Sequence, residues 1–278
     1  MTTVARALQE ATLALARDDG RTEAELLLAQ LLQRTRAWLV AHDHDVLEIE
    51  ARTKFFALVD RRCRGEPVAH ILGRRGFWTL DLVVTADTLI PRPETERLVE
   101  LALDQLPMAN PVRVLDLGTG TGAIALAIAS ERPRAEVTAV DADARALAIA
   151  RKNAARLGLQ RVRFLRSDWF SAIAGEIFNL IATNPPYLAE DDSHLAEGDL
   201  RFEPRHALAS GQDGLDAIRS IVARAPLHLY ANGALLIEHG WRQGDAVRTL
   251  MATAGFAEVG TATDLEGRER VTTGRWPG

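Results

Sequence analysis

The 278-residue sequence contains one cysteine, Cys63, and its longest unbroken apolar run extends only from Ala123 to Ala129. A single cysteine excludes an internal disulfide and an all-cysteine metal site, and we expect a reduced, partly buried thiol. A membrane-spanning helix needs about 20 apolar residues, so the sequence predicts none. The N-terminus lacks the basic-then-apolar pattern of a secretory signal. These absences predict a cytoplasmic protein without a membrane partner.

Basic residues are not in excess either, because 33 Lys and Arg side chains stand against 38 Asp and Glu side chains, a formal net charge of -5. Proteins that bind phosphates widely are usually basic, so the balance disfavours nucleic acid as the main partner. The hydrophobic fraction of 47% and the charged fraction of 26% exclude a disordered or fibrous chain. At roughly 150 residues per domain, the length predicts one or two domains.

Residues 1–75 follow a helical pattern without strand alternation. A helix face is predicted by the i, i+4, i+7, i+11 spacing of Val4, Leu8, Ala11 and Leu15. Thr22 and Glu25 have the spacing of a capping box, which predicts the start of a second helix. A third helical stretch covers residues 48–64. This part is predicted to be a small helical bundle.

From residue 76 the period changes. Residues 76–90 are rich in aromatic and β-branched side chains and predict a short β-hairpin that links two domains. Residues 91–278 alternate strands and helices, which predicts an α/β fold with a doubly wound, mostly parallel sheet and a site at the carboxyl ends of its strands. The strands are expected at 112–117, 136–140, 162–165, 180–183, 234–237, 256–261 and 269–273.

A glycine-rich turn follows the first of these strands, with the sequence Asp116-Leu117-Gly118-Thr119-Gly120-Thr121-Gly122-Ala123. Its glycines allow close backbone approach to a ligand, and the next helix offers free N–H groups. Asp141 ends the second strand, where a carboxylate can accept hydrogen bonds from ribose hydroxyls. The pattern also fits a dinucleotide-binding fingerprint, so the loop alone does not identify the cofactor.

Asp168 and Trp169 follow the third strand on the same edge of the predicted sheet. There Asp168 can accept from the exocyclic amine of an adenine, and Trp169 can stack on its ring. A helix cap remains an alternative for Asp168, as does a core aromatic for Trp169.

The fourth strand leads into Asn184-Pro185-Pro186-Tyr187. The two prolines remove backbone donors and hold the preceding carbonyls rigidly, and the Asn184 side chain adds a further acceptor. This arrangement suits a planar NH2 group, with Tyr187 over its face. Amide and exocyclic amine nitrogens are poor nucleophiles, and acceptors on both hydrogens stabilise the charge that develops when they are methylated. No metal is needed for this chemistry.

The turn, Asp141 and the Asn-Pro-Pro-Tyr element resemble the seven-stranded, Rossmann-like methyltransferases that depend on S-adenosylmethionine. Three further segments, at residues 65–73, 89–96 and 201–204, narrow the match. Together with the helical N-terminal part, they resemble the peptide chain release factor glutamine methyltransferases (the PrmC/HemK family). The resemblance implies methylation of the glutamine of the Gly-Gly-Gln motif in class I release factors, with S-adenosylhomocysteine as the second product. It also implies a docking role for residues 1–75, and we expect a monomer.

The resemblance assigns roles residue by residue. The methionine end of the cofactor is expected against Gly118, Thr119, Gly120, Thr121 and Gly122, its ribose against Asp141, and its adenine against Asp168 and Trp169. Asn184, Pro185, Pro186 and Tyr187 are expected to hold the substrate amide, with Asn184 also near the cofactor. Arg92 and Glu94 are expected to shape the pocket mouth, although a salt-bridged hinge remains an alternative. Glu238 and His239 support either the site or only the core.

Two other substrate classes use related sites. A relative that methylates a ribosomal protein on glutamine typically has Ser-Pro where this chain has Pro93-Glu94. Methylation of a nucleic-acid base uses the same Asn-Pro-Pro-Tyr element but predicts a basic cleft. A nicotinamide-dependent oxidoreductase fits the glycine turn and leaves residues 184–187 unexplained.

Overall fold

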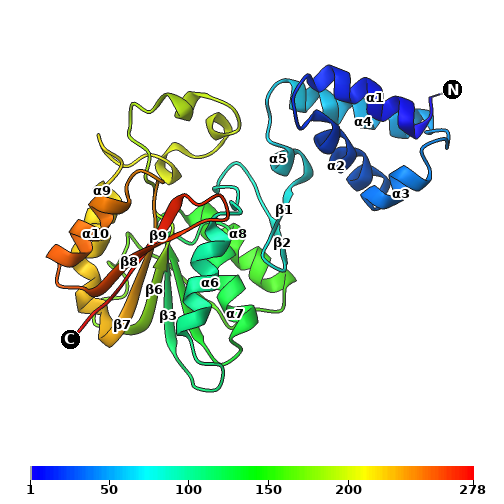
Figure 1. Cartoon of the computed structure of the whole chain (residues 1–278). Coiled ribbons are helices and arrows are strands. Elements are labelled where there is room, and N and C mark those ends of the chain that lie inside the picture. The colour runs from blue at the N-terminus through cyan, green and yellow to red at the C-terminus, as the bar shows by residue number, and fades with distance from the viewer. Residues whose placement is uncertain (1) are drawn as a thin grey trace. The chain divides into compact units, whose positions relative to one another are not determined.

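A computed structural model describes residues 2–278, which divide into two compact units after Arg74 (Figure 1). The first unit is mainly helical, and the second is built on a β-sheet. The helices of the first unit are α1 (Val4–Leu15), α2 (Gly20–Leu32), α3 (Arg36–Ala41), α4 (Ile49–Cys63) and α5 (Val68–Leu72).

The predicted apolar face of α1 forms part of the core of the first unit. Val4, Leu8 and Leu15 are all at most 6% exposed, and they pack with apolar residues of α2 and α4. An ion pair between Arg62 and Glu23 is closed inside the same unit. The helical bundle is therefore stabilised by apolar packing around one enclosed charge pair.

Two local predictions for the first unit were wrong. The Thr22–Glu25 capping box does not form, because α2 begins two residues earlier, at Gly20. The Glu25 carboxylate is instead bound by Arg21 and Arg36, at 2.6 and 2.7 Å. Cys63, expected to be partly buried, is an exposed free thiol.

The second unit begins with a two-stranded ribbon and continues with a seven-stranded sheet. The ribbon comprises β1 (Arg74–Phe77) and β2 (Leu80–Val83). The strand order of the sheet is β5-β4-β3-β6-β7-β9-β8, and all neighbours are parallel except those of β9. This confirms the predicted mostly parallel α/β fold. The sheet strands are β3 (Arg113–Leu117), β4 (Glu136–Asp141), β5 (Arg163–Arg166), β6 (Phe178–Thr183), β7 (Leu229–Glu238), β8 (Ala257–Thr263) and β9 (Glu269–Arg275).

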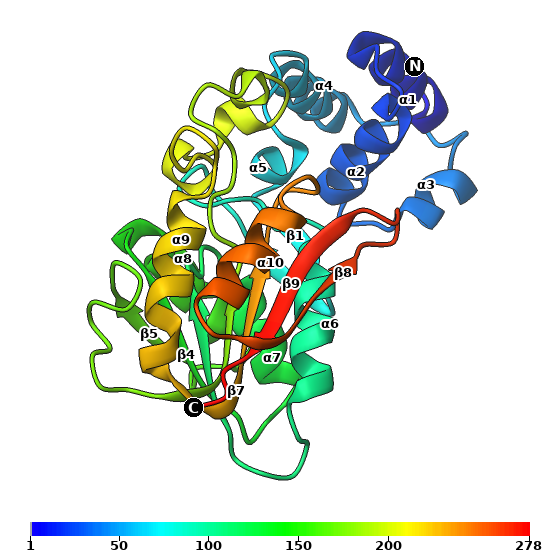
Figure 2. The same ribbon diagram turned by 60° about the vertical axis from the view of Figure 1, so that its left-hand side comes forward.

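Helices cover both faces of the sheet (Figures 1 and 2). One face packs against α6 (Thr95–Gln105), α7 (Ala123–Glu131) and α8 (Ala144–Arg156). The other packs against α9 (Asp216–Arg224) and α10 (Gly244–Thr253). Successive residues of a strand contribute to opposite faces, as with Val114 and Leu115 of β3, so both faces of the sheet are buried. The sheet is therefore doubly wound.

The strand register brings the predicted site to one edge of the sheet. Leu117 of β3 is paired with Val140 of β4 on one side and Thr183 of β6 on the other, and Thr183 is paired with Ile237 of β7. The residues that follow these four positions therefore lie side by side. Three short 3-10 helices lie in the connection from β6 to α9: Ser193–Ala196, Leu200–Phe202 and Arg205–Ala207. A fourth, Ala225–His228, follows α9 and lies at the other end of the sheet, where β7 begins beside the start of β6.

Candidate active site

The turn after β3 is fixed by main-chain hydrogen bonds to the neighbouring strand. The backbone N–H groups of Gly118 and Thr119 both donate to the Val140 carbonyl, at 2.9 Å. Gly118 and Gly120 have φ values of 73° and 53°, which favour glycine. A Cβ atom on Gly120 would meet nothing within 4 Å, so this part of the turn faces open space.

Two carboxyl groups brace the turn from beneath. Asp116 is fully buried, and its Oδ2 accepts hydrogen bonds from the Thr119 hydroxyl at 2.6 Å and the Ala125 N–H at 3.2 Å. Burial raises its pKa to about 7. Asp141 accepts from the N–H groups of Gly120 and Asp143, both at 2.9 Å, and burial raises its pKa as well. Asp141, the residue predicted to bind the ribose, is thus held in place by the glycine turn.

Trp169 adopts a left-handed backbone conformation, with φ 47°. The Ser167 hydroxyl donates to its carbonyl at 2.7 Å, and this bond holds the strained residue. Its ring lies next to the glycine turn, since a Cβ on Gly118 would be 3.6 Å from it. The indole therefore forms one wall of the site.

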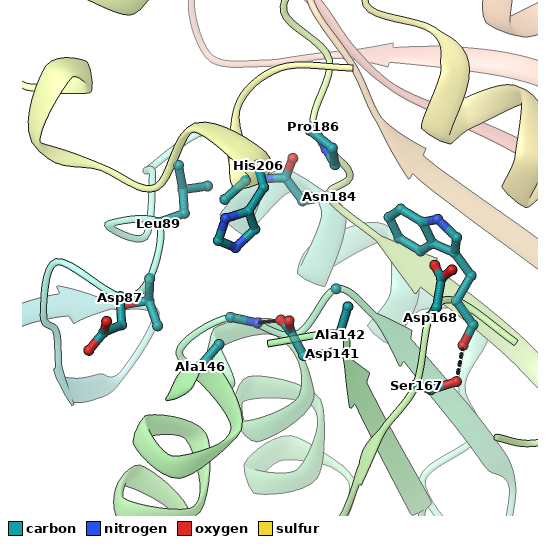
Figure 3. A pocket seen from close by; sticks show the side chains of 15 residues that line it. Asp87, Leu89, Asp141, Ala142, Ala146, Ser167, Asp168, Asn184, Pro186 and His206 are labelled. Carbon is teal, nitrogen blue, oxygen red and sulfur yellow. Dashed lines mark hydrogen bonds between the residues drawn. The ribbon is translucent and has the colours of Figure 1, made fainter. Parts of the chain in front are cut away.

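These elements enclose a first cavity of about 150 Å³ (Figure 3). Of the residues expected to bind the cofactor, six line it: Gly118, Gly120, Asp141, Asp168, Trp169 and Asn184. Thr119, Thr121 and Gly122 do not line it. Thr119 and Thr121 are buried behind the turn, and Gly122 precedes α7, so the three shape the loop. The site brings together the larger part of the predicted set.

Sequence reasoning missed other residues of the first cavity. Asp87, Thr88 and Leu89 follow the β1–β2 ribbon, and His206 comes from the β6–α9 connection. His206 lies 3.7 Å from the Asp143 carboxylate. No local motif indicates His206. Leu89, in contrast, belongs to the segment at residues 89–96, one of the three that carry the family resemblance.

A second cavity of about 120 Å³ adjoins the Asn-Pro-Pro-Tyr element. Its lining includes Arg92, Pro185 and Tyr187, together with apolar residues of the β6–α9 connection. Asn184 and Pro186 line both cavities. The two cavities therefore adjoin at the Asn-Pro-Pro-Tyr element.

The Asn184 side chain is anchored by distant residues. Its Nδ2 donates to the Thr95 hydroxyl oxygen at 3.1 Å. Glu238, which ends β7, is 1% exposed and interacts with the same two residues. His239 is turned to other partners, with Nε2 2.8 Å from the Thr272 hydroxyl. Glu238 thus neighbours a residue that lines both cavities, whereas His239 has its partner in β9.

Arg92 and Glu94, both predicted to shape the pocket mouth, line different cavities in the structure. The Arg92 guanidinium forms a short ion pair with Glu203, a side chain without exposed surface that also accepts from the Ile90 N–H at 2.9 Å. Burial raises the pKa of Glu203, and Arg92 opposes that rise. Glu94 lines neither of the two cavities but a groove of about 480 Å³ between the start of α6 and the β8–β9 turn.

Residues 2–278 contain neither a membrane-spanning helix nor a cluster of metal ligands. None of the described helices combines the length and the apolar composition that crossing a bilayer requires. Within the same range, no three side chains of His, Cys, Asp or Glu are grouped so that they could ligate a metal ion.

Comparison with known proteins gives a consistent result for both units. Residues 6–73 match the family model described as the PrmC N-terminal domain, and residues 95–202 match the methyltransferase small domain. A release factor glutamine methyltransferase of Xylella fastidiosa is 57% identical over 258 residues, which cover 93% of this chain and 94% of that protein. One of Escherichia coli K12 is 48% identical, with 94% of each chain covered.

Solved structures share the fold. The crystal structure of a methyltransferase from Pyrococcus furiosus matches with a TM-score of 0.55 at 17% identity, over 79% of this chain and 97% of that chain. At this identity the likeness extends to the fold alone. The sequence relatives go further, because they are about half identical over nearly the whole length. The chain belongs to the family of release factor glutamine methyltransferases.

Proposed function

We propose that this protein transfers a methyl group from S-adenosylmethionine to the side-chain amide nitrogen of the glutamine in the Gly-Gly-Gln motif of class I release factors. The observation that carries the proposal is the meeting of two cavities at Asn184 and Pro186. One cavity has groups suited to a nucleoside, and the other has acceptors suited to an amide. The names of the relatives supply the substrate class.

The residues of the first cavity fit S-adenosylmethionine. Asp141 presents a carboxylate for ribose hydroxyls while its two bonds to backbone amides keep it in place. Asp168 and Trp169 supply an acceptor and an aromatic face for adenine, and the open space at Gly120 admits the methionine end. The cofactor, when bound, would supply a methyl group made electrophilic by a positively charged sulfur. Transfer would form the N–CH3 bond and break the S–CH3 bond, giving neutral S-adenosylhomocysteine, and the amide nitrogen would release one of its two protons to solvent.

The residues of the second cavity act on the substrate amide. Asn184 Oδ1 and the Pro185 carbonyl accept its two N–H groups, which holds the nitrogen in line with the first cavity. Because acceptors favour loss of amide delocalisation, these hydrogen bonds are stronger in the transition state than in the ground state. Tyr187 packs on the amide face. Burial raises the pKa of the Tyr187 phenol, so it remains neutral during turnover.

The remaining expected residues have supporting roles in this proposal. Thr119, Thr121 and Gly122 maintain the shape of the turn. Arg92 ties the segment before α6 to the β6–α9 connection through Glu203. Glu94 lies at the start of α6, where its charge acts on Tyr187. The helical unit of residues 1–74 contacts the release factor outside the tripeptide, and the reaction takes place in the cytoplasm.

The test is a competition among substrate classes. Purified protein and radiolabelled S-adenosylmethionine are incubated with a mixture of release factors, ribosomal proteins and nucleic acids. We expect label on the release factor, at the glutamine of the tripeptide by mass spectrometry, and none with Asn184→Ala. Label on a ribosomal protein or a nucleic acid, with none on the release factor, would contradict the proposal.

A further inference from the structure

Glu238 is an acid closed off from solvent at the end of a central strand. Only 1% of the residue is exposed, and within residues 2–278 its Oε2 atom has no hydrogen-bond partner. A buried carboxyl group costs free energy unless its oxygens are hydrogen-bonded. Glu238 pairs with the neighbouring strand through its main chain, so this pairing does not require an acidic side chain. An acid at this position therefore calls for a reason beyond folding.

The polar neighbours of Glu238 are Thr95, the first residue of α6, and Asn184. Burial raises the pKa of the Glu238 carboxyl to about 7, and hydrogen bonds from Thr95 and Asn184 oppose that rise. A carboxylate can only accept hydrogen bonds, so both neighbours donate to it.

This requirement fixes the direction of the next hydrogen bond. Thr95 has one hydroxyl hydrogen, and when Glu238 accepts it the hydroxyl oxygen can only accept in turn. Asn184 meets that oxygen with Nδ2, at 3.1 Å. Thr95 is 4% exposed, so water does not compete for these positions. Nδ2 is bound to Thr95 and has Glu238 as a neighbour, so Oδ1 is the end of the amide that remains for a ligand.

We propose that Glu238 and Thr95 are positioning residues that hold the Asn184 amide with its nitrogen inward and its oxygen toward the substrate nitrogen. The inference rests on the proposed methyl transfer to an amide. A reversed Asn184 amide would set an NH2 group against the NH2 group of the substrate, donor against donor. Because an asparagine amide is nearly symmetric in shape, packing alone does not select the orientation, and the hydrogen bonds to Thr95 and Glu238 do.

Charged groups from other elements also act on Glu238. Arg270 of β9 favours its ionised form, and Glu94 at the start of α6 disfavours it. The ionised form enforces the hydrogen-bond direction, whereas the protonated form can itself donate to Thr95. We therefore expect kcat to rise with pH through a limb near pH 7.

The test compares Thr95→Val and Glu238→Gln with the wild type in methylation of a release factor. We expect kcat to fall about 10- to 100-fold, since losing a group that contacts the transition state costs about 100- to 1,000-fold. KM for the release factor and the dissociation constant for S-adenosylmethionine should change less than about threefold. Glu238→Gln should also lose the limb near pH 7. The double variant should be no slower than Thr95→Val, because both substitutions break one hydrogen-bond chain.

Two control variants separate orientation from folding. Thr95→Ser keeps the hydroxyl and should retain kcat within about threefold. Thr138→Val removes another buried hydroxyl, from the middle of β4, and should leave kcat unchanged. The proposal is overturned if Thr95→Ser is as slow as Thr95→Val, if the two losses multiply in the double variant, or if KM changes in place of kcat. A wild-type enzyme that does not label the release factor would instead refute the proposed function.

Discussion

The two sides of the site hold their polar groups in different ways. On the side of the first cavity, Asp116 and Asp141 are held by the turn that they brace, through backbone N–H groups and one hydroxyl near the turn. On the side of the second cavity, Asn184 and Arg92 are held by side chains from distant segments, Thr95 and Glu203.

This difference indicates different demands on the two sides. Main-chain donors cannot be replaced by substitution, so they give a durable platform for a cofactor common to many enzymes. Side-chain partners can vary while the fold stays the same, which suits the side that selects the substrate. We therefore expect substitutions on the first side to change binding of S-adenosylmethionine, and those on the second to change turnover or recognition of the release factor.

The largest effect is expected for Asn184→Ala. The substrate amide loses an acceptor whose bond is strongest in the transition state, so kcat should fall about 100- to 1,000-fold. Because Asn184 lines both cavities, calorimetry of S-adenosylmethionine binding decides which side it serves. A change in affinity of less than about threefold would place it on the substrate side. Asn179→Ala, at the opposite end of the same strand, is the matched control. An equal loss of cofactor affinity and turnover would show that the two sides of the site do not have separate roles.

Asp141→Ala should produce the next effect, on the cofactor alone. A hydrogen bond to a charged group contributes about 1.5–3 kcal/mol, so the dissociation constant for S-adenosylmethionine should rise about 10- to 100-fold. At saturating cofactor, kcat should change less than about threefold. Asp213→Ala, which removes an exposed partner of Arg219, serves as the control. Unchanged affinity in calorimetry would remove Asp141 from the ribose role.

The same difference explains how much could be predicted from the sequence. The mostly parallel sheet followed from strand and helix alternation. The family followed from the glycine turn, the Asn-Pro-Pro-Tyr element and the segments at residues 65–73, 89–96 and 201–204, together with the helical N-terminal part. Asp141 could be predicted because its partner, Gly120, lies in a recognisable turn one strand away. The Thr95–Asn184 bond and the Arg92–Glu203 pair could not, since they join segments 89 and 111 residues apart. No local pattern records such pairings.

Local patterns also failed where another interaction was stronger. Thr22 and Glu25 have the spacing of a capping box, but Glu25 is bound by Arg21 and Arg36. Thr22 lies inside α2, which begins at Gly20, so the carboxylate is free to take two charged partners. At Asn153, by contrast, an interaction forms that no local pattern predicts. This polar residue lies inside a helix, and its side chain bonds to the backbone of Val83 and Thr121, which connects the ribbon to the glycine turn.

A third prediction concerns pH and the two buried carboxyl groups, Asp116 and Glu238. Burial raises the pKa of both to about 7, from ordinary values of 3.8 and 4.5. Between about pH 4 and pH 7 the unfolded chain releases these protons while the folded protein keeps them. The free energy of unfolding should therefore fall as pH rises through this window, by at most about 1.4 kcal/mol per pH unit for each group, and level off above it.

Asp116→Asn should make that slope shallower while the hydrogen bonds from Thr119 and Ala125 are kept. Urea unfolding at several pH values measures the slope. Asp213→Asn is the matched control, because Arg219 lowers the pKa of Asp213 to about 2 and its contribution lies below this window. Equal slopes for Asp116→Asn and the wild type would show that Asp116 does not keep its proton in the folded state.

The smallest effect on turnover is expected at Arg92, where the sequence left open a contact at the pocket mouth or a salt-bridged hinge. Arg92 is the charge partner of Glu203, whose side chain has no exposed surface, so Arg92→Met leaves a buried group unsatisfied and should cost about 1–3 kcal/mol of stability. That corresponds to a fall in Tm of several degrees, whereas Arg92→Lys, which keeps the charge, should lose less. Both variants should keep KM for the release factor within about threefold. If instead both raise KM about tenfold at unchanged Tm, Arg92 contacts the substrate, and the second side of the site extends to the pocket mouth.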